Sequence, residues 1–404
     1  MNSGDTAWVL AASALVLLMT PGLALFYGGL ARSKNASATI MHSFMTIGIV
    51  GVVWVLWGYT LAFGPDVGGV VGDLSKFGLS GVSAVASADE NISEQTFMIF
   101  QAMFAIITPA LITGAFAERM KFSAFVIFIT LWVTVVYAPV AHWVWADGGW
   151  LLDLGSKDFA GGTVVHINSG VAALAAAIIF GRRLGFGREP MEPHNVPLIV
   201  LGAALLWFGW FGFNAGSALA ADHFAVNAFV VTNTATCAAV VAWVAMSWIF
   251  GKKPSVIGAA SGAVAGLVAI TPASGFVGPM PAVVIGLGAG VFCYGAIQLL
   301  AKLNVDDSLS VWGVHGVGGT WGALATGLFV GVGFLSFDEL AGASTRLGQI
   351  WFQLVAIGAT WVWTFGVTSA ILLAIKYTIG LRVSEAEEET GLDVSVHAEP
   401  AYRL

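Results

Sequence analysis

Two pairs of an aspartate and a histidine stand in otherwise apolar stretches of the sequence. Asp158 precedes His166 in DFAGGTVVHINSG, and Asp307 precedes His315 in DSLSVWGVHGVGG, with the same spacing of eight residues. Eight helical residues rise about 12 Å, so an acid at the membrane edge would place its histidine near the middle of a bilayer core about 30 Å thick. Ionisable groups at that depth are costly and usually functional. We interpret the two pairs as one device used twice; the alternative is that each histidine only packs between helices.

The other histidines fall at the ends of predicted spans, in loops or in the tail. They are His42, His142, His194, His223 and His397. Only His166 and His315 are therefore expected in the middle of a span. A neutral imidazole offers one hydrogen-bond donor and one acceptor, so a pair of them can share a proton.

The composition excludes a soluble globular enzyme. Of the 404 residues, 58% are hydrophobic and 10% are charged, whereas a soluble domain carries about 25% charged residues. The sequence contains no phosphate-binding glycine loop, zinc-protease helix, cysteine-pair metal site or nucleophile triad. One metal ion cannot use both Asp/His pairs, because each carboxylate would lie about 12 Å from its histidine. We therefore predict a polytopic membrane protein that is not an enzyme and that needs no metal, cofactor or nucleic acid.

Apolar runs separated by polar breaks predict an all-α protein with eleven transmembrane helices. These helices cover residues 7–30, 38–63, 95–117, 123–145, 159–181, 197–217, 226–250, 256–274, 282–301, 313–334 and 347–377. The first run lacks the basic leader and short core of a signal peptide, so we expect it to be retained. The last run is long enough to tilt strongly or to extend beyond the bilayer. Residues 1–380 would form the membrane domain and residues 381–404 a cytoplasmic tail.

Basic residues predict the orientation, because they concentrate on the cytoplasmic side of membrane proteins. Of the sixteen Lys and Arg residues, Lys76, Lys157 and Arg346 fall on one side. The other thirteen, from Arg32 to Arg403, fall on the opposite side. The N-terminus is therefore expected outside and the C-terminus inside.

This topology turns the second Asp/His stretch upside down relative to the first. The helix after Asp158 would enter the membrane from outside, and the helix after Asp307 would enter it from inside. Five helices in residues 1–196 and five in residues 197–334 would then form an inverted repeat, a common transporter plan with the working site near the midplane. The tetrapeptide ITPA recurs in the third and eighth predicted helices, which such a repeat pairs.

Aromatic and polar residues gather near the predicted outer ends of three helices. Phe104 lies on the third helix, Trp145 ends the fourth, and WFGFNAGS, which contains Phe213 and Ser217, ends the sixth. A cation over an aromatic face gains about 0.5–2 kcal/mol, and a hydroxyl accepts a hydrogen bond from an N–H donor. Such a set suits a small cation that carries N–H groups. The alternative is the interfacial aromatic belt that membrane proteins commonly have.

The sequence resembles the ammonium transporters, a family related to the methylammonium permeases and the Rhesus glycoproteins. The resemblance runs from the first helix to the tail and rests on PGLALFYGGL, FAERMKFSA, DFAGGTVVHINSG, WFGFNAGS and GLRVSEAEEETGLDVSVHAEPAY. It is closer to the microbial and plant branch, because Rhesus proteins generally lack the pair that Trp145 and Ser217 resemble. By this resemblance, Phe104, Trp145 and Ser217 would form an outer ammonium site. Phe104 and Phe213 would stack below it as a gate.

The same resemblance implies that His166 and His315 line a narrow apolar pore. Asp158 would be a structural and proton-handling carboxylate near the outer site, and Asp307 its cytoplasmic counterpart. Moving an intact ammonium-like ion into a low dielectric costs on the order of tens of kcal/mol, far more than a cation–π contact returns. Deprotonation before entry would let neutral ammonia cross, and it would reject potassium, which has no proton to lose. The proton would cross as well, which makes the transport electrogenic.

The resemblance further implies a homotrimer in the cell membrane that serves nitrogen uptake, with one pore per subunit. Ammonium would be the substrate, and the sequence leaves open whether methylammonium is also carried. A PII-type signalling protein would bind the cytoplasmic face, and the tail of residues 381–404 would dock there and couple the subunits. The acidic composition of the tail has a plainer explanation, which is a disordered solubilising end.

Other functions fit the same sequence. A passive ammonia or gas channel would use the same pore without net charge movement. An ammonium sensor with the transporter fold would also need Trp145 and Ser217. A membrane-embedded metal hydrolase is a further and weaker alternative.

Overall fold

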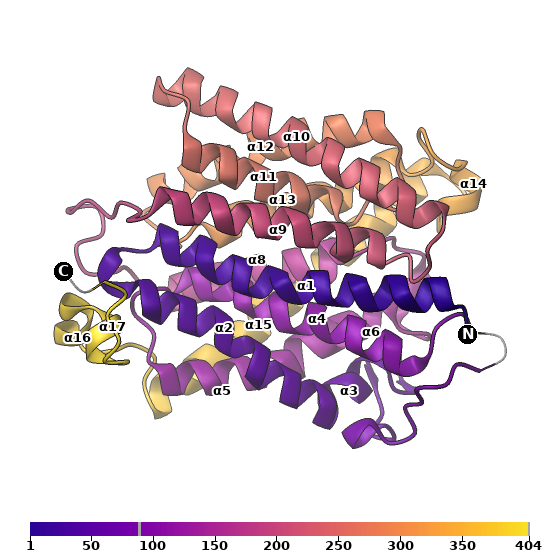
Figure 1. Ribbon diagram of the computed structural model, residues 1–404, viewed down its shortest axis with the longest axis horizontal. Helices are drawn as coiled ribbons and strands as arrows, with labels where there is room; N and C mark the ends of the chain where they lie inside the picture. Colours follow the sequence, from indigo (N-terminus) through magenta and orange to yellow (C-terminus); the bar gives the residue numbers. More distant parts are fainter. Residues whose placement is uncertain (88–89, 403–404) are drawn as a thin grey trace.

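The computed structural model describes residues 1–87 and 90–402 and shows a bundle of long helices (Figure 1). Most of the helices run along one common direction, with the start of the first helix at one end of the bundle and the short C-terminal helices at the other (Figure 1). Arg403, which the charge pattern assigned to the inner side, lies outside the described residues.

The first part of the chain forms five helical segments, some of them continuous through a π-helical turn. In chain order these are α1 (Ser3–Leu30); α2 (Ala36–Val53) with η2 (Trp54–Gly58) and α3 (Tyr59–Phe63); α4 (Glu94–Ile112) with η4 (Thr113–Ala115); α5 (Phe122–Trp132) with η5 (Val133–Tyr137) and α6 (Ala138–Trp145); and η6 (Gly162–Ile167) with α8 (Asn168–Phe180). Shorter elements lie between them: η1 (Ser33–Asn35), the hairpin of β1 (Asp66–Val67) and β2 (Val71–Gly72), η3 (Phe77–Leu79) and α7 (Trp150–Leu154).

The second part forms six more helical segments and two short tail helices. The segments are α9 (Val196–Gly216), α10 (His223–Gly251), α11 (Val256–Ile270), α12 (Pro279–Lys302), η7 (Trp312–Gly316) with α13 (Val317–Phe329), and α15 (Arg346–Thr378). The tail carries α16 (Glu385–Thr390) and α17 (Leu392–Ser395), and α14 (Phe337–Leu340) lies between α13 and α15. Several of these helices begin at a polar residue whose side chain accepts hydrogen bonds from the first backbone N–H groups, as Asp222 does for α10 and Ser255 for α11.

The helical membrane class is confirmed, since each of the predicted apolar ranges overlaps a helical segment. Within the described ranges, 9 helices are long and apolar enough to cross a membrane, and α11 is a shorter apolar helix. The count of eleven crossings and the N-out orientation stay predictions. One boundary is wrong in a way that matters, because the helix expected from residue 159 begins at Gly162.

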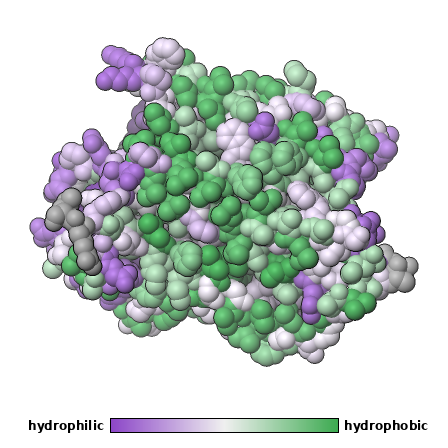
Figure 2. All heavy atoms as spheres, viewed as in Figure 1, coloured by the Kyte–Doolittle hydropathy of each residue, from purple (hydrophilic) through white to green (hydrophobic). Residues whose placement is uncertain are grey.

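The outer surface fits a membrane environment. Hydrophobic side chains cover the middle of the molecule, and hydrophilic side chains gather toward its two ends (Figure 2). Large apolar side chains such as Phe44, Phe208 and Trp248 are exposed on it. A surface of this kind is stable against lipid tails rather than water.

The two segments that carry the mid-span histidines share a local structure and touch. Each histidine lies in a π-helical turn, His166 in η6 and His315 in η7, and each turn continues into an α-helix. A Cβ atom added at Gly170 would lie 2.0 Å from the backbone nitrogen of Gly316. The two segments therefore cross at a distance that only glycine permits, and the crossing brings the histidine turns together.

Candidate functional site

The residues predicted for the outer site line one cavity. Phe104 comes from α4, Trp145 ends α6, and Ser217 is the residue that caps the end of α9. The cavity has a volume of about 120 Å³, and its lining also includes Phe97, Phe100, Gln101, Phe159 and Leu219. The structure thus brings these three sequence-predicted residues together.

Hydrogen bonds decide which groups this cavity presents. The Trp145 indole N–H donates to the backbone oxygen of Asp158 at 2.9 Å. The Ser217 hydroxyl donates to the backbone oxygen of Phe213, also at 2.9 Å. The cavity therefore meets the face of an indole ring and the lone pairs of a hydroxyl oxygen. Both suit a cation with N–H donors.

Two closely packed, tilted phenyl rings separate this cavity from the interior. The ring centroids of Phe104 and Phe213 are 4.3 Å apart with an interplanar angle of 36°, and the ring of Trp145 stands at 88° to that of Phe104 at 5.8 Å. Phe104 and Phe213 are fully buried. The two rings therefore form the kind of barrier that the predicted gate requires.

The two mid-span histidines are in direct contact behind these rings. The Nδ1 atoms of His166 and His315 lie 3.3 Å apart, and the two imidazole planes are stacked at 26°. A hydrogen bond between two Nδ1 atoms needs one proton, which only one ring supplies. One Nε2 atom is then left as a donor and the other as an acceptor, so the pair presents both functions to a small molecule.

The space around the histidines is narrow and mostly apolar. A cavity of about 10 Å³ lies against His166 and His315 and is lined by aliphatic and aromatic side chains, among them Phe213. That volume holds about one water-sized molecule. On the inner side, His315 also lines a cavity of about 320 Å³ that reaches Tyr27 and Ser308. These features follow one another as a pathway: the outer cavity, the packed phenyl rings, the histidine pair and the inner cavity.

Trp210 belongs to this pathway, although its place beside His166 did not follow from the sequence. Its ring stacks on the imidazole of His166 with centroids 5.3 Å apart and an interplanar angle of 19°. Its indole N–H donates to the Thr271 hydroxyl at 2.9 Å. The available signal was spacing, because Trp210 precedes Phe213 by three residues on α9 and therefore shares its face.

Asp158 has a different position from the one that helical spacing gave. Residues 158–161 are not helical, and neither are residues 307–310, so neither aspartate is joined to its histidine by a continuous helix of eight residues. The distance of about 12 Å expected from a helical rise therefore does not apply to either pair. The Asp158 carboxylate instead accepts hydrogen bonds from four backbone N–H groups at the start of η6. The donors are Gly161 at 2.8 Å, Gly162 at 2.7 Å, Thr163 at 2.7 Å and Val164 at 3.3 Å.

These bonds make Asp158 a cap that holds the histidine turn. Burial raises the pKa of this carboxyl, and the four N–H groups oppose that effect because they stabilise the charged form. A carboxylate at a helix N-terminus is also favoured by the helix dipole. Asp158 thus couples the outer site, through its backbone bond to Trp145, to the turn that carries His166.

Asp307 occupies the equivalent place at the start of η7. Its Oδ2 accepts a hydrogen bond from the backbone N–H of Trp312 at 2.8 Å, whereas its Oδ1 has no partner among the described residues. Burial raises the pKa of this carboxyl to about 6. Each aspartate of the sequence repeat therefore caps the turn that carries its histidine. The inner aspartate accepts fewer hydrogen bonds than the outer one.

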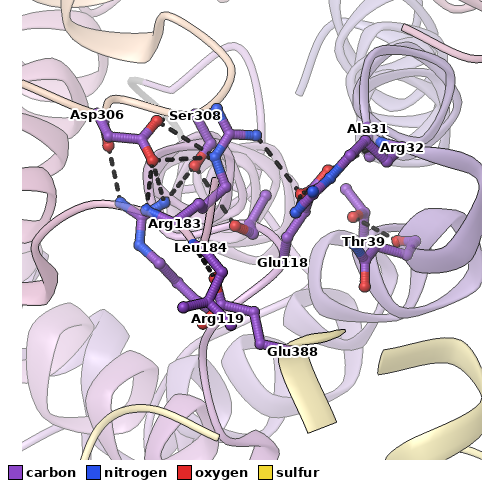
Figure 3. A network of polar contacts seen from close by, with 12 residues as sticks. Ala31, Arg32, Thr39, Glu118, Arg119, Arg183, Leu184, Asp306, Ser308 and Glu388 are labelled. Atoms are coloured by element: carbon purple, nitrogen blue, oxygen red, sulfur yellow. Dashed lines mark hydrogen bonds and ion pairs between the residues drawn. The ribbon is translucent and has the colours of Figure 1, made fainter. Parts of the chain in front are cut away.

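A buried network of charges, which the sequence did not predict, includes Asp306, the residue before Asp307 in the chain (Figure 3). Asp306 accepts hydrogen bonds from Arg183, with the closest ionic contact at 2.9 Å, and lies 3.5 Å from Arg119. Arg32 pairs with Glu118 at 2.5 Å. Burial lowers the pKa of Arg119 to about 10. The signal for this network in the sequence was the charged residues of FAERMKFSA. Charged residues tolerate burial when they are paired with opposite charges.

The C-terminal tail is docked against this network. Glu388 accepts a hydrogen bond from the Leu184 backbone N–H at 2.8 Å (Figure 3). It also accepts one from Arg382 at 2.5 Å. Asp393 accepts the backbone N–H groups of Ser37 and Ala38 at 3.0 and 2.8 Å, at the start of α2. In its described part the tail is therefore ordered on the membrane domain, which contradicts the alternative of a disordered end.

Comparison with known proteins agrees with this geometry. The sequence model of the Ammonium Transporter Family matches residues 7–402. An ammonium transporter of Bacillus subtilis (strain 168) is 50% identical over 407 residues, which cover 100% of this chain and 99% of that protein. The structure of Saccharomyces cerevisiae Mep2 superposes with a TM-score of 0.87 at 36% identity, covering 95% of this chain and 91% of that chain. A protein described as a sensor Amt protein superposes with a TM-score of 0.91 at 33% identity, covering 97% and 98%. The chain therefore belongs to the ammonium transporter family.

Proposed function

We propose that this protein is a selective ammonium transporter that separates ammonium into ammonia and a proton and moves both. Ammonium is bound in the outer cavity by Phe104, Trp145 and Ser217 and gives up a proton there to solvent water. The proton-sharing pair of His166 and His315 then carries a proton inward. Ammonia then passes the Phe104 and Phe213 rings and follows the histidine pair to the inner cavity. The observation that carries the proposal is the 3.3 Å contact between the Nδ1 atoms of His166 and His315.

Energies favour this route over passage of the intact ion. A bare ammonium ion in the apolar segment would lose solvation worth on the order of tens of kcal/mol, and the aromatic rings return about 0.5–2 kcal/mol each. A space of about 10 Å³ beside the histidines has no room for a hydrated ion. Neutral ammonia needs only one donor and one acceptor, which a proton-sharing imidazole pair supplies.

Substitution of the histidines tests the proposal. We expect His166→Leu and His315→Leu each to lower ammonium transport in proteoliposomes at least about tenfold and to weaken the rejection of potassium, because a polar relay is lost. His223→Leu is the matched control, since this histidine is exposed at the start of α10. Intact transport and selectivity in both pore variants would mean that the pair only packs.

The remaining parts of the proposal rest on the family. The protein is a homotrimer in the cell membrane, with no enzymatic activity, and a PII-type protein binds its cytoplasmic face. Its docked tail regulates transport. Support for the last point comes from the bond that Glu388 accepts from the Leu184 N–H and from the bonds that Arg382 donates to the backbone oxygens of Phe180 and Arg182. These bonds tie the tail to the end of the His166 helix and the residues that follow it.

A sensor is the second candidate, because the fold matches that of the sensor Amt protein over nearly its whole length. A sensor would bind ammonium in the same outer cavity and conduct no charge. A passive ammonia channel is the third, because the narrow apolar cavity suits a small neutral molecule. Charge movement separates both of them from the electrogenic transporter.

A further inference from the structure

A second pairing of a histidine and an aspartate lies at the outer end of the molecule. His142 is on α6, three residues before Trp145, and its side chain is 0% exposed. Its partner Asp66 begins the β1–β2 hairpin, and 30% of its side chain is exposed. The sequence placed His142 only at the end of a span, because nothing local indicates a partner so distant along the chain.

Both ring nitrogens of His142 face oxygen atoms. Nδ1 lies 2.9 Å from the backbone oxygen of Ala62, and Nε2 lies 2.9 Å from Oδ1 of Asp66. A backbone oxygen carries no hydrogen, so Nδ1 must be the donor in the first contact. The second contact then needs one further proton between Nε2 and Oδ1, because two lone pairs would otherwise face each other. The hydrogen bond from His142 lowers the pKa of Asp66, because it stabilises the carboxylate form.

Asp66 also fixes the chain that follows Trp145. Its carboxylate accepts the backbone N–H of Gly69 at 2.8 Å, which closes the hairpin turn. A Cβ added at Gly148 would lie 2.9 Å from the Cβ of Asp66, so the turn after Trp145 packs directly on this residue. The Trp150 N–H donates to the Gly69 oxygen at 3.2 Å. The His142–Asp66 bridge therefore joins the hairpin to α6, while the hairpin also packs on the turn that follows Trp145. Trp145 lies between these two contacts.

The bridge borders the mouth of the ammonium pathway. Asp66 and Trp145 both line an outer vestibule of about 900 Å³, which shares Phe97 and Leu219 with the outer cavity. The other charged side chains that line it are Lys76, Glu90, Glu94, Asp147 and Asp222. Titratable groups on the elements packed against α6 are Tyr59, Tyr137, Asp153 and His166. In the described parts of the chain, the polar contacts of His142 are those to Ala62 and Asp66.

We propose that the His142–Asp66 bridge positions Trp145 in the outer site and that its single shared proton makes ammonium capture depend on the outside pH. The proposal rests on the outer cavity being the ammonium site. Loss of the proton at alkaline pH places the Nε2 lone pair against a carboxylate at a contact of 2.9 Å. The hairpin is then repelled from α6, and the aromatic face offered to ammonium moves. His142 and Asp66 are positioning residues, since they touch no substrate.

The isosteric variant Asp66→Asn provides the sharpest test. The introduced side-chain amide would donate to the unprotonated Nε2 while Nδ1 still donates to Ala62, so the bridge would form without a titrating proton. We expect the apparent KM of wild-type currents, expressed as ammonium ion, to rise as the external pH is raised, because the bridge loses its shared proton. The Asp66→Asn variant should show a flat profile with a KM close to the low-pH wild-type value. The maximal current should change little in either protein.

Two further variants complete the design. Asp66→Ala removes the bridge, and we expect an apparent KM about tenfold higher at every pH, with the maximal current largely retained. Asp73→Asn is the matched control, because this substitution makes the same change of charge in the same outer segment. The Asp73 carboxylate accepts hydrogen bonds from Ser75. It should keep the wild-type pH profile.

Two results would overturn the inference: a wild-type pH slope in Asp66→Asn, or an unchanged KM in Asp66→Ala. If Asp66→Ala fails to insert into membranes, the pH profile of Asp66→Asn still decides. Absence of any ammonium-driven current in the wild type is a separate result, which would contradict the proposed transport function. Ammonium binding, measured by the quenching of tryptophan fluorescence at the same pH values, would then still test the bridge.

Discussion

The outer and inner Asp/His stretches have the same spacing in the sequence but hold their carboxylates differently. Asp158 accepts four backbone N–H groups at the start of η6. Asp307 accepts the N–H of Trp312 at the start of η7 and keeps an oxygen with no partner within the described ranges. The outer carboxylate thus accepts bonds on both oxygens, whereas the inner one has an unpartnered oxygen in the described part of the chain and a pKa raised to about 6. The same sequence pattern therefore gives two carboxylates that differ in the number of donors around them.

The largest expected effect separates the two caps. Asp158→Ala leaves four buried N–H groups at the start of η6 without their acceptor, and each such loss costs about 1–3 kcal/mol. We expect ammonium uptake to fall at least about a hundredfold, because the turn that carries His166 and the backbone bond to Trp145 both lose support. Uptake into proteoliposomes at equal protein density measures this loss.

The control for this change is Asp153→Ala, an exposed carboxylate in the nearby helix α7. It removes the same charge without touching η6, so its uptake should match the wild type. Asp158→Ala would contradict the structural interpretation if it retained wild-type uptake and wild-type thermal stability.

The sequence could predict the helices and which residues lie together along the cavities, but not the caps. Apolar runs identify spans because a bilayer tolerates no unpaired backbone, and most helix boundaries followed. Phe104, Trp145, Ser217 and Phe213 were found from their chemistry and from the family resemblance. The predicted position of Asp158 relative to its helix was wrong, because the apolar pattern of the sequence does not show at which residue the helix begins. Here glycines precede the helix start.

Contacts between distant parts of the chain were the second feature that the sequence could not predict. The pairing of His166 with His315 was suggested by the repeat and by the family resemblance. Their Nδ1 separation of 3.3 Å depends on a glycine crossing that neither of these specifies. His142 and Asp66 gave no sign of their pairing, because each is an ordinary residue in its own segment. The basic residues that pair with Asp306 were used only to predict the inner side, because the sequence does not show which acids they contact.

Titration of Asp307 sharpens the comparison. Its pKa is about 6 in the folded protein against a usual value of 3.8, so the folded state holds a proton that the unfolded chain has released. Its contribution to stability is therefore fully present below pH of about 4 and is lost as the pH rises to about 6, with a change of up to about 3 kcal/mol. Thermal unfolding in detergent across this range measures it.

The Asp307→Asn variant should lack this component of the pH dependence, because its amide still accepts from Trp312 but does not titrate. Asp338→Asn serves as the control, since this aspartate lies in the short helix α14. Parallel stability curves for the wild type and Asp307→Asn between pH of about 4 and 6 would show that Asp307 takes up no proton there.

The smallest expected effect concerns the tail on the inner side. Deletion of residues 390–404 removes the bonds from Asp393 to the start of α2 and from Leu392 to Asn35. We expect uptake to fall about fivefold with unchanged membrane insertion, because coupling across a docked segment is typically worth a few kcal/mol at most. Asp393→Asn, which weakens only two of these bonds, should fall between the deletion and the wild type. Unchanged uptake after the deletion would limit the tail to a passive role.

The most direct test of the central claim is charge movement after an ammonium pulse onto proteoliposomes adsorbed to a supported membrane. The account predicts a transient current with ammonium, none with potassium at the same concentration, and a strongly reduced current in His166→Leu. No ammonium current in the wild type would contradict electrogenic transport. The interior pH would then identify the alternative: alkalinisation beyond that of protein-free liposomes indicates a passive ammonia channel, and none indicates a sensor.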